Sequence, residues 1–119
     1  MKDILFLLNP NFKDPVRDDK GILYYCPDCA FLEGVLSYYP NLREQLDIRY
    51  IDYPRPRKEI VMMVGDLHQG CPHLVLDTQN LPYASLDLFY QYGNHYHTDN
   101  TKTIVNYLSN RYGTPVAHY

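Results

Sequence analysis

The stretch YYCPDCAFLEGVLSYYP, residues 24–40, decides which fold the chain is expected to have. Pro27 suits the first turn of a helix, because the N–H that proline lacks would have no partner there. Apolar residues then recur at helical spacing until Pro40 ends the pattern. We therefore predict a helix that begins directly after Cys26 and carries Cys29 one turn further on, on the same side.

Apolar runs on either side of this helix predict strands and a second helix. Residues 4–8, ILFLL, form a continuous apolar run that is typical of a strand buried on both faces. Residues 46–51 and 74–76 predict the second and third strands. The second helix is expected over residues 58–68. Its apolar face would consist of Ile60, Met63, Val64 and Leu67.

The last part of the chain is less regular. Residues 86–92 alternate with a period of two, which predicts a strand or one arm of a hairpin, and YGNH and YHT supply a turn and a return strand. A final helix is expected to be capped by Asp99 or Thr101 and to close at Gly113. The order β-α-β-α-β-(β)-α predicts an α/β fold with a central mixed four-stranded sheet flanked by helices.

Length and composition indicate one soluble domain over residues 1–119. The chain is 45% hydrophobic and 21% charged, and its net charge of −3 gives no field that would attract nucleic acid. The basic cluster PRPRK, residues 54–58, is interpreted as a solvated loop and helix start. The apolar run near the N-terminus is too short for a signal peptide or a membrane span. We expect a cytoplasmic protein, monomeric or homodimeric, with no nucleic-acid or membrane partner.

The two cysteines of CPDC are the candidate catalytic residues. At a helix N-terminus, free N–H groups and the helix dipole favour a thiolate at Cys26. Cys29, one turn later, lies close enough to attack a mixed disulfide formed at Cys26. We therefore assign Cys26 as the nucleophile and Cys29 as the resolving thiol. The alternative is that both are small buried apolar residues.

A strand, CPDC opening a helix, a second strand and helix, and Pro72 entering a third strand together resemble the thioredoxin and glutaredoxin superfamily. The CPxC form is most similar to glutaredoxins. More closely, the chain resembles a small bacterial thioredoxin-like family of unknown function. That resemblance covers nearly the whole chain and is carried by FLLNP, YYCPDCAFLEGVLSYYP, IDYPRPR, GCPHLVL and IVNYLSNRYGTP.

The resemblance implies a thioredoxin-like fold and a thiol–disulfide oxidoreductase activity. Cys26 would be the exposed nucleophile and Cys29 the buried resolver. Pro72 would be a cis-proline that leaves Cys71 free to bind an extended substrate, so Cys71 and Pro72 join Tyr25 and Pro27 as candidate substrate-binding residues. The partners would be protein or low-molecular-weight thiols and disulfides, with glutathione as a cosubstrate and no bound cofactor.

Three features depart from the superfamily pattern. The carboxylate of Asp28 should raise the pKa of Cys26 and blunt its reactivity. Residues 9–25 form a 17-residue loop before CPDC, far longer than the connection in glutaredoxins. Cys71 directly precedes Pro72, so three thiols should converge. A second insertion is expected in the hairpin region, residues 77–98.

Three converging thiols keep other functions open. Zinc accepts three cysteines and one histidine, so Cys26, Cys29 and Cys71 with His73 form an alternative metal site, and an iron–sulfur cluster would need one further ligand. His68, His95 and His97 are weaker candidates, and the last two are expected on a polar surface loop. Cys71 could instead pair with Cys26 in an alternative disulfide. A redox-inactive interaction domain is the third possibility.

Overall fold

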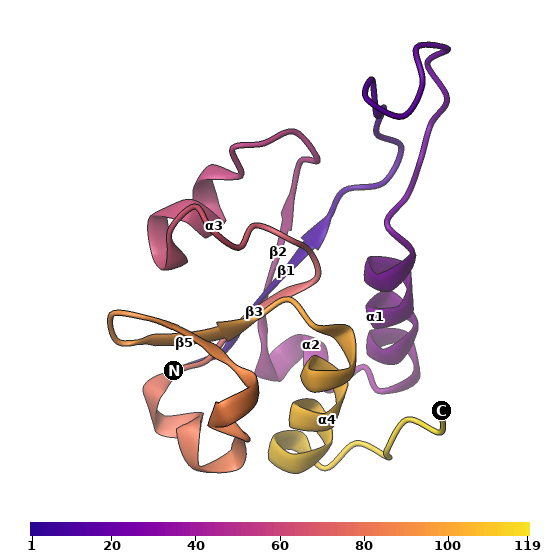
Figure 1. The fold of residues 1–119 in the computed structure, drawn as a ribbon. Helices are drawn as coiled ribbons and strands as arrows, with labels where there is room; N and C mark the ends of the chain where they lie inside the picture. Colours follow the sequence, from indigo (N-terminus) through magenta and orange to yellow (C-terminus); the bar gives the residue numbers. More distant parts are fainter.

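A computed structural model describes residues 1–119 and shows a mixed open sheet of five strands flanked by helices (Figure 1). The strands are β1 (Ile4–Leu8), β2 (Asp47–Ile51), β3 (His73–Val75), β4 (Tyr90–Tyr92) and β5 (His95–Thr98). They lie in the order β2-β1-β3-β5-β4. β1 and β2 are parallel, and the other three pairs are antiparallel.

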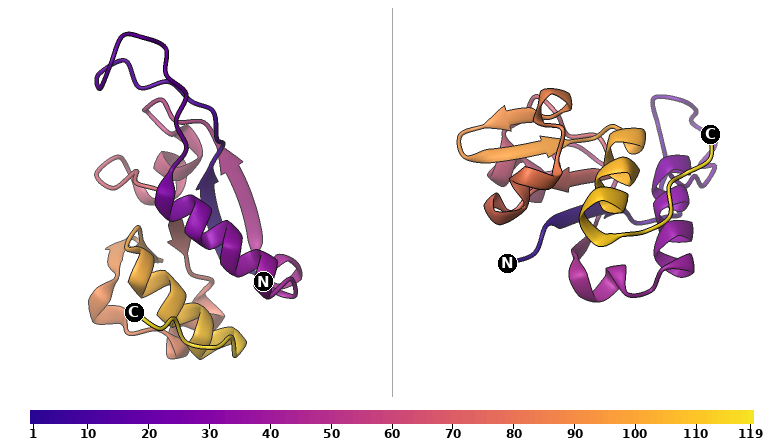
Figure 2. Two further views of the ribbon diagram at one scale, coloured as in Figure 1. Left: turned by 90° about the vertical axis from the view of Figure 1, so that its right-hand side faces the viewer. Right: turned by 90° about the horizontal axis from the view of Figure 1, so that it is seen from below.

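Helices cover both faces of this sheet. They are α1 (Pro27–Tyr38), α2 (Leu42–Gln45), α3 (Lys58–Val64) and α4 (Thr101–Tyr112), with 3-10 turns η1 (Thr78–Tyr83) and η2 (Leu86–Leu88). α1 and α4 lie on one face, and α3 lies on the other (Figures 1 and 2). None of these helices combines the length and the apolar character needed to cross a membrane.

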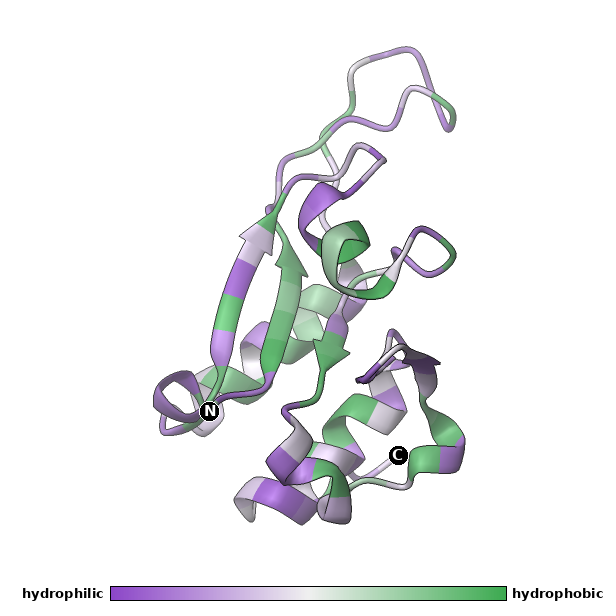
Figure 3. Ribbon diagram, turned by 90° about the vertical axis from the view of Figure 1, so that its left-hand side faces the viewer, coloured by the Kyte–Doolittle hydropathy of each residue, from purple (hydrophilic) through white to green (hydrophobic).

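β1 lies inside the sheet because its sequence has no polar side. Leu5, Phe6 and Leu7 are fully buried, as expected for a strand covered on both faces. β2, by contrast, is an edge strand whose polar residues Asp47 and Arg49 alternate with apolar ones (Figure 3). The carboxyl end of β1 therefore leads out of the core toward the loop that precedes α1.

The prediction of a four-stranded sheet is wrong, because the hairpin near residues 90–98 contributes both of its arms. β5 pairs with β3, and β4 adds a short outer strand to β5. All three residues of β4 are exposed. Only part of the period-two pattern is a strand, since residues 86–88 form η2 instead.

Two helix boundaries also differ from the prediction. α3 ends at Val64 rather than near residue 68, because Gly65 adopts a φ of 81° and breaks the helix. Leu67 is consequently outside the helix and 85% exposed. α4 begins at Thr101, and its cap is Asn100, whose side chain accepts a hydrogen bond from the N–H of Thr103.

A buried carboxylate joins the start of β1 to the end of the chain. Asp3 is fully buried, and its Oδ1 accepts hydrogen bonds from the Asp77 N–H at 2.6 Å and from Asn80 Nδ2 at 3.0 Å. Its Oδ2 accepts from the hydroxyls of Tyr107 and Tyr112, both in α4. Four donors satisfy the charge, which would otherwise be costly to bury.

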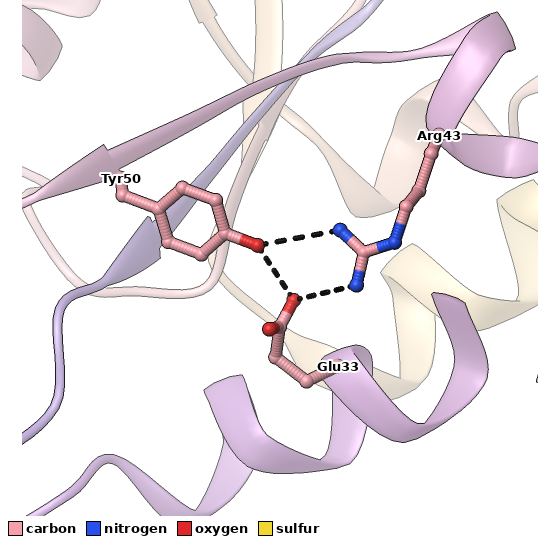
Figure 4. Close-up of polar contacts among 3 residues, drawn as sticks. All are labelled: Glu33, Arg43 and Tyr50. Atoms are coloured by element: carbon pink, nitrogen blue, oxygen red, sulfur yellow. Dashed lines mark hydrogen bonds and ion pairs between the residues drawn. The ribbon is translucent and has the colours of Figure 1, made fainter. Parts of the chain in front are cut away.

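A polar contact on the surface holds α1 against the edge of the sheet (Figure 4). The hydroxyl of Tyr50 in β2 donates to Glu33 Oε1 in α1 at 2.8 Å, and Arg43 of α2 lies 3.4 Å from both side chains. The ion pair is more than two-fifths exposed, so it contributes little stability. The contact does connect α1, the helix that begins with CPDC, to α2 and β2.

Candidate functional site

Cys26 caps the N-terminus of α1, as the sequence predicts. Its backbone is extended, with φ −77° and ψ 117°, and Pro27 is the first helical residue. Cys26 Sγ accepts a hydrogen bond from the N–H of Cys29 at 3.1 Å. This is the bond by which a capping side chain satisfies an otherwise unpaired N–H in the first helical turn.

These contacts favour the thiolate of Cys26. A hydrogen bond from the Cys29 side chain is the strongest influence that lowers the pKa of Cys26, and the N–H groups of Cys29 and Asp28 lower it further, to about 6. Partial burial opposes the shift without cancelling it. A large part of Cys26 is therefore ionised near neutral pH.

The expected effect of Asp28 is correct in direction but is outweighed. Its negative charge raises the pKa of Cys26, yet this is a weaker influence than the hydrogen bonds around Cys26. The Asp28 N–H itself is one of the groups that favour the thiolate. Asp28 therefore opposes ionisation of Cys26, as predicted, but the pKa of Cys26 is lowered overall, because the hydrogen bonds around its sulfur outweigh the charge of this exposed side chain.

Cys29 lies on the inner side of α1. It is 3% exposed, and its Sγ accepts a hydrogen bond from the Leu8 N–H, at the end of β1, at 3.5 Å. The hydrogen bond that it donates to Cys26, followed by its burial, raises the pKa of Cys29 far above the ordinary range. Cys29 thus stays protonated while Cys26 is ionised.

Cys71, 45 residues after Cys26 in the sequence, also lies at this site. The Cys71–Pro72 peptide bond is cis, as the resemblance implies, and Cys26 Sγ lies 3.6 Å from the carbonyl oxygen of Cys71. Pro72 is buried beside it. Burial raises the pKa of the Cys71 thiol to about 11, while the charge of Arg57 and a hydrogen bond from its side chain act in the opposite direction.

Cys26 and Cys71 both line a cavity of about 580 Å³. Tyr25 and Pro27 line it as well, so three of the four candidate substrate-binding residues share a cavity with Cys26, whereas Pro72 is buried and does not line it. The remaining lining residues are Leu8, Phe12, Asp14, Arg17, Leu23, Tyr24, Tyr53, Arg55, Arg57 and Gly70. The cavity is large enough for a small organic molecule or the tip of a peptide.

The inserted loop over residues 9–25 forms one wall of this cavity. It extends beyond the N-terminus of α1 (Figure 1). Phe12 and Tyr24 close its base through two backbone hydrogen bonds of 3.1 and 2.8 Å, and Phe12 stacks on Tyr53 at a centroid distance of 4.3 Å. The inserted loop is therefore held in place by specific contacts and belongs to the site.

Three arginines face the cavity without an ion-pair partner. The structure contains two salt bridges, Arg43–Glu33 and Arg49–Asp47, and neither involves Arg17, Arg55 or Arg57. Against these three positive charges, Asp14 is the single carboxylate in the lining. Among the residues that line the cavity, positively charged side chains therefore outnumber carboxylates.

Arg57 was not identified as a site residue from the sequence. It belongs to the cluster PRPRK, which we expected to be solvated, but Arg57 is 6% exposed. Its Nη1 donates to the carbonyl of Gln69 at 2.7 Å, and its Nε donates to that of Tyr53 at 3.0 Å. Gln69 lies two residues before Cys71, a contact that no local pattern predicts.

The histidines lie apart from the three thiols. His73 is fully buried and turns away from CPDC: its Nδ1 donates to the Gly70 carbonyl, and its Nε2 bonds His97 Nδ1, both at 2.9 Å. His97 is 1% exposed rather than on a surface loop, and burial lowers its pKa to about 4. His68 stacks on Tyr90, and His95 is partly buried.

The alternative metal set of Cys26, Cys29, Cys71 and His73 is thus divided. Both ring nitrogens of His73 have protein partners, so His73 is not oriented toward the thiols. No group of three or more histidine, cysteine, aspartate or glutamate side chains in the structure has a geometry suited to a metal ion. The backbones of Cys29 and Cys71 do approach Cys26 Sγ, through the N–H of the first and the carbonyl of the second.

Comparison with known proteins gives one family. Neither the search of curated proteins nor the search of solved structures gave a match. Residues 2–116 match the family described as "Protein of unknown function (DUF3088)". Because that match covers nearly all of the sequence that builds the sheet and the dithiol cavity, the chain belongs to the DUF3088 family.

Proposed function

We propose that this protein is a thiol–disulfide oxidoreductase with a thioredoxin-like fold and a glutaredoxin-like CPDC site. The observation that carries the proposal is the asymmetry of the two cysteines. Cys26 is partly exposed in a cavity and has its pKa lowered to about 6, whereas Cys29 is buried behind it and remains protonated. Cys26 would therefore act as the nucleophile, and Cys29 would act later as the resolving thiol.

The topology supports this proposal. The helix that carries CPDC follows β1, and the cis-proline directly precedes β3, the neighbour of β1, so the two segments face each other at one end of the sheet. This is the arrangement that the resemblance to the thioredoxin superfamily implies. In this proposal, β4 and the loop over residues 9–25 are additions to that framework.

The reaction would proceed by two exchanges. The Cys26 thiolate attacks one sulfur of a substrate disulfide, forms a mixed disulfide and releases the other half of the substrate as a thiolate. Cys29 loses its proton to solvent and attacks Cys26 Sγ. The Cys26–Cys29 disulfide forms, and the second half leaves as a thiolate. The substrate gains two electrons, and a protein thiol or a small thiol such as glutathione returns the enzyme to its dithiol form.

The charges of the cavity indicate which substrates it favours. Arg17, Arg55 and Arg57 outnumber Asp14, and even with Cys26 ionised one positive charge remains in excess. Disulfides that carry carboxylates should therefore be attracted, and those that carry amines should be repelled. Tyr24, Tyr25 and Tyr53 offer apolar ring surface beside the charged groups.

The test uses a neutral probe, bis(2-hydroxyethyl) disulfide, and intact-mass measurement at pH 7. The reduced wild-type protein should lose two hydrogen atoms as its internal disulfide forms. A variant that retains Cys26 alone, Cys29→Ser/Cys71→Ser, should stop at the mixed disulfide and gain one mercaptoethanol unit. Cys26→Ser serves as the matched control and should react at the slow rate of an ordinary thiol. If wild type reacted no faster than this control, the proposed function would be wrong.

A further inference from the structure

The third cysteine has no role in the two-thiol reaction, yet it lies at the reacting atom. The carbonyl of Cys71 is 3.6 Å from Cys26 Sγ, and both residues line the same cavity. Cys71 is partly exposed, whereas Cys29 is 3% exposed. A mixed disulfide at Cys26 would therefore lie in a cavity that a second cysteine, Cys71, also lines, while Cys29 lies in the core.

Arg57 makes the surroundings of Cys71 different from those of Cys29. Three hydrogen bonds fix this arginine: its backbone N–H donates to Gln69 Oε1 at 2.8 Å, and its guanidinium donates to the carbonyls of Gln69 and Tyr53. Its charge and its hydrogen bond favour the thiolate of Cys71. Cys29 has no cationic neighbour; a single N–H, that of Leu8, favours its thiolate.

Formation of the mixed disulfide makes both remaining thiols easier to ionise. The negative charge on Cys26, which disfavours ionisation of both other thiols, disappears when Cys26 is bonded to the substrate. Burial still raises the pKa of Cys29 in this state. Burial also holds back ionisation of Cys71, but Cys71 retains the favourable positive charge of Arg57, which Cys29 lacks.

We propose that Cys71 is a second resolving thiol of this site. Its thiolate attacks Cys26 Sγ of the mixed disulfide, the Cys26–Cys71 bond forms, and the substrate half leaves as a thiolate. The proton of Cys71 passes to solvent, and the two electrons go to the substrate, so no further oxidant is needed. This inference rests on the proposed function, because it requires Cys26 to form the mixed disulfide first.

The experiment compares Cys29→Ser with Cys29→Ser/Cys71→Ser. Each reduced protein is mixed with bis(2-hydroxyethyl) disulfide, quenched in acid at intervals and weighed intact. In Cys29→Ser the mixed disulfide should decay at least about tenfold faster than in the double variant. It should give a product that has lost two hydrogen atoms, and proteolytic mapping should place the new bond between Cys26 and Cys71.

The pH dependence separates a chemical role from a structural one. Below the pKa of Cys71 the thiolate fraction rises about tenfold per pH unit, so the decay in Cys29→Ser should accelerate in that proportion between pH 7 and 9. Oxidised wild-type protein, mapped in the same way, should contain some Cys26–Cys71 bond. It also provides the test if Cys29→Ser does not fold.

The two proposals fail in different ways. A mixed disulfide that persists equally in the single and double variants, together with wild-type protein that contains only the Cys26–Cys29 bond, would overturn the role of Cys71 and leave the oxidoreductase intact. Absence of any mixed disulfide at Cys26 in all variants would overturn the proposed function itself.

Discussion

The N–H of Cys29 donates a hydrogen bond to Cys26 Sγ over 3.1 Å, so the second cysteine of CPDC stabilises the ionised form of the first. The Cys29 side chain adds a further hydrogen bond to the same sulfur. Because the backbone supplies one of these two bonds, replacing the Cys29 side chain removes only part of the stabilisation.

Alkylation of Cys26 should follow a pH profile centred near pH 6. Its pKa is lowered to about 6, so the thiolate is the minor form below that pH and nearly the sole form at pH 8. The rate of reaction with iodoacetamide should rise through this interval and then level off. Peptide mass spectrometry measures the rate at each cysteine. A midpoint above pH 8 at Cys26 would contradict the geometry at the start of α1.

Replacing Asp28 by asparagine should lower the pKa of Cys26 further. The substitution removes a negative charge that raises this pKa but keeps the Asp28 backbone N–H that lowers it. The midpoint of the alkylation profile should therefore shift to lower pH by a fraction of a unit. The free energy of unfolding should fall by about 0.5 kcal/mol, since a carboxylate in the first helical turn favours the helix. A shift to higher pH is the opposing result.

The site should prefer an anionic disulfide to a cationic one. One net positive charge about 7 Å from the substrate charge is worth about 0.6 kcal/mol in water, so substrates of opposite sign should differ about eightfold in rate. Dithiodipropionate and cystamine provide the pair, measured at low ionic strength with the Cys26-only variant.

Arg55 should account for much of this preference. It lines the cavity, is exposed and forms no salt bridge, so Arg55→Gln should bring the two rates close together. Arg43→Gln is the matched control, because Arg43 does not line the cavity, and it should leave the eightfold ratio unchanged. Equal ratios in wild type and Arg55→Gln would show that this arginine does not act on the substrate.

Loss of the Asp3 carboxylate should be strongly destabilising. Asp3→Ala leaves two tyrosine hydroxyls, the Asn80 amide and a backbone N–H without their buried acceptor, at a cost of about 3 kcal/mol. Asp47→Ala, which removes a half-exposed partner of Arg49, should cost less than about 1 kcal/mol. Urea unfolding followed by tyrosine fluorescence compares the two variants. Similar costs for both would mean that the Asp3 contacts are weak.

Two glycine substitutions should have opposite effects on the free energy of unfolding. At Gly65 the φ of 81° disfavours any side chain, and an added Cβ would lie 2.7 Å from the ring of Tyr92, so Gly65→Ala should cost about 2 kcal/mol. At Gly34, inside α1, an added Cβ meets nothing within 4 Å, and Gly34→Ala should stabilise the protein by about 0.5–1 kcal/mol. Thermal unfolding distinguishes the two. A stable Gly65→Ala variant would argue against this backbone conformation.

The sequence predicts those parts of the fold that depend on local patterns. ILFLL has no polar side and becomes the buried strand β1, and the Cys26–Pro27 pair marks the start of α1 because a cap and a first-turn proline are local requirements. The alternating pattern over residues 86–92 predicts β4 as a hairpin arm, but only Tyr90–Tyr92 pair with β5, since residues 86–88 form η2 instead. Leu67 continues a helical pattern, but the backbone of Gly65 ends the helix first.

The sequence predicts where the cysteines of the candidate site lie, but it does not predict which charged residues join them. CPDC and the Cys71–Pro72 pair carry their positions in short motifs. The burial of Arg57, by contrast, depends on carbonyls of Tyr53 and Gln69, which approach it only in the folded chain. The hydrogen bond between His73 and His97 likewise requires the register that pairs β3 with β5, and 24 residues separate the two histidines.

The Asp3 network also bears on the order in which a growing chain can fold on the ribosome. Asp3 is synthesised more than 100 residues before its partners Tyr107 and Tyr112. Until α4 has left the exit tunnel, β1 cannot bury its leading carboxylate with all four donors in place. A nascent chain that already contains the complete dithiol site therefore still lacks two of the four donors to Asp3, and this network is completed only after α4 has been synthesised.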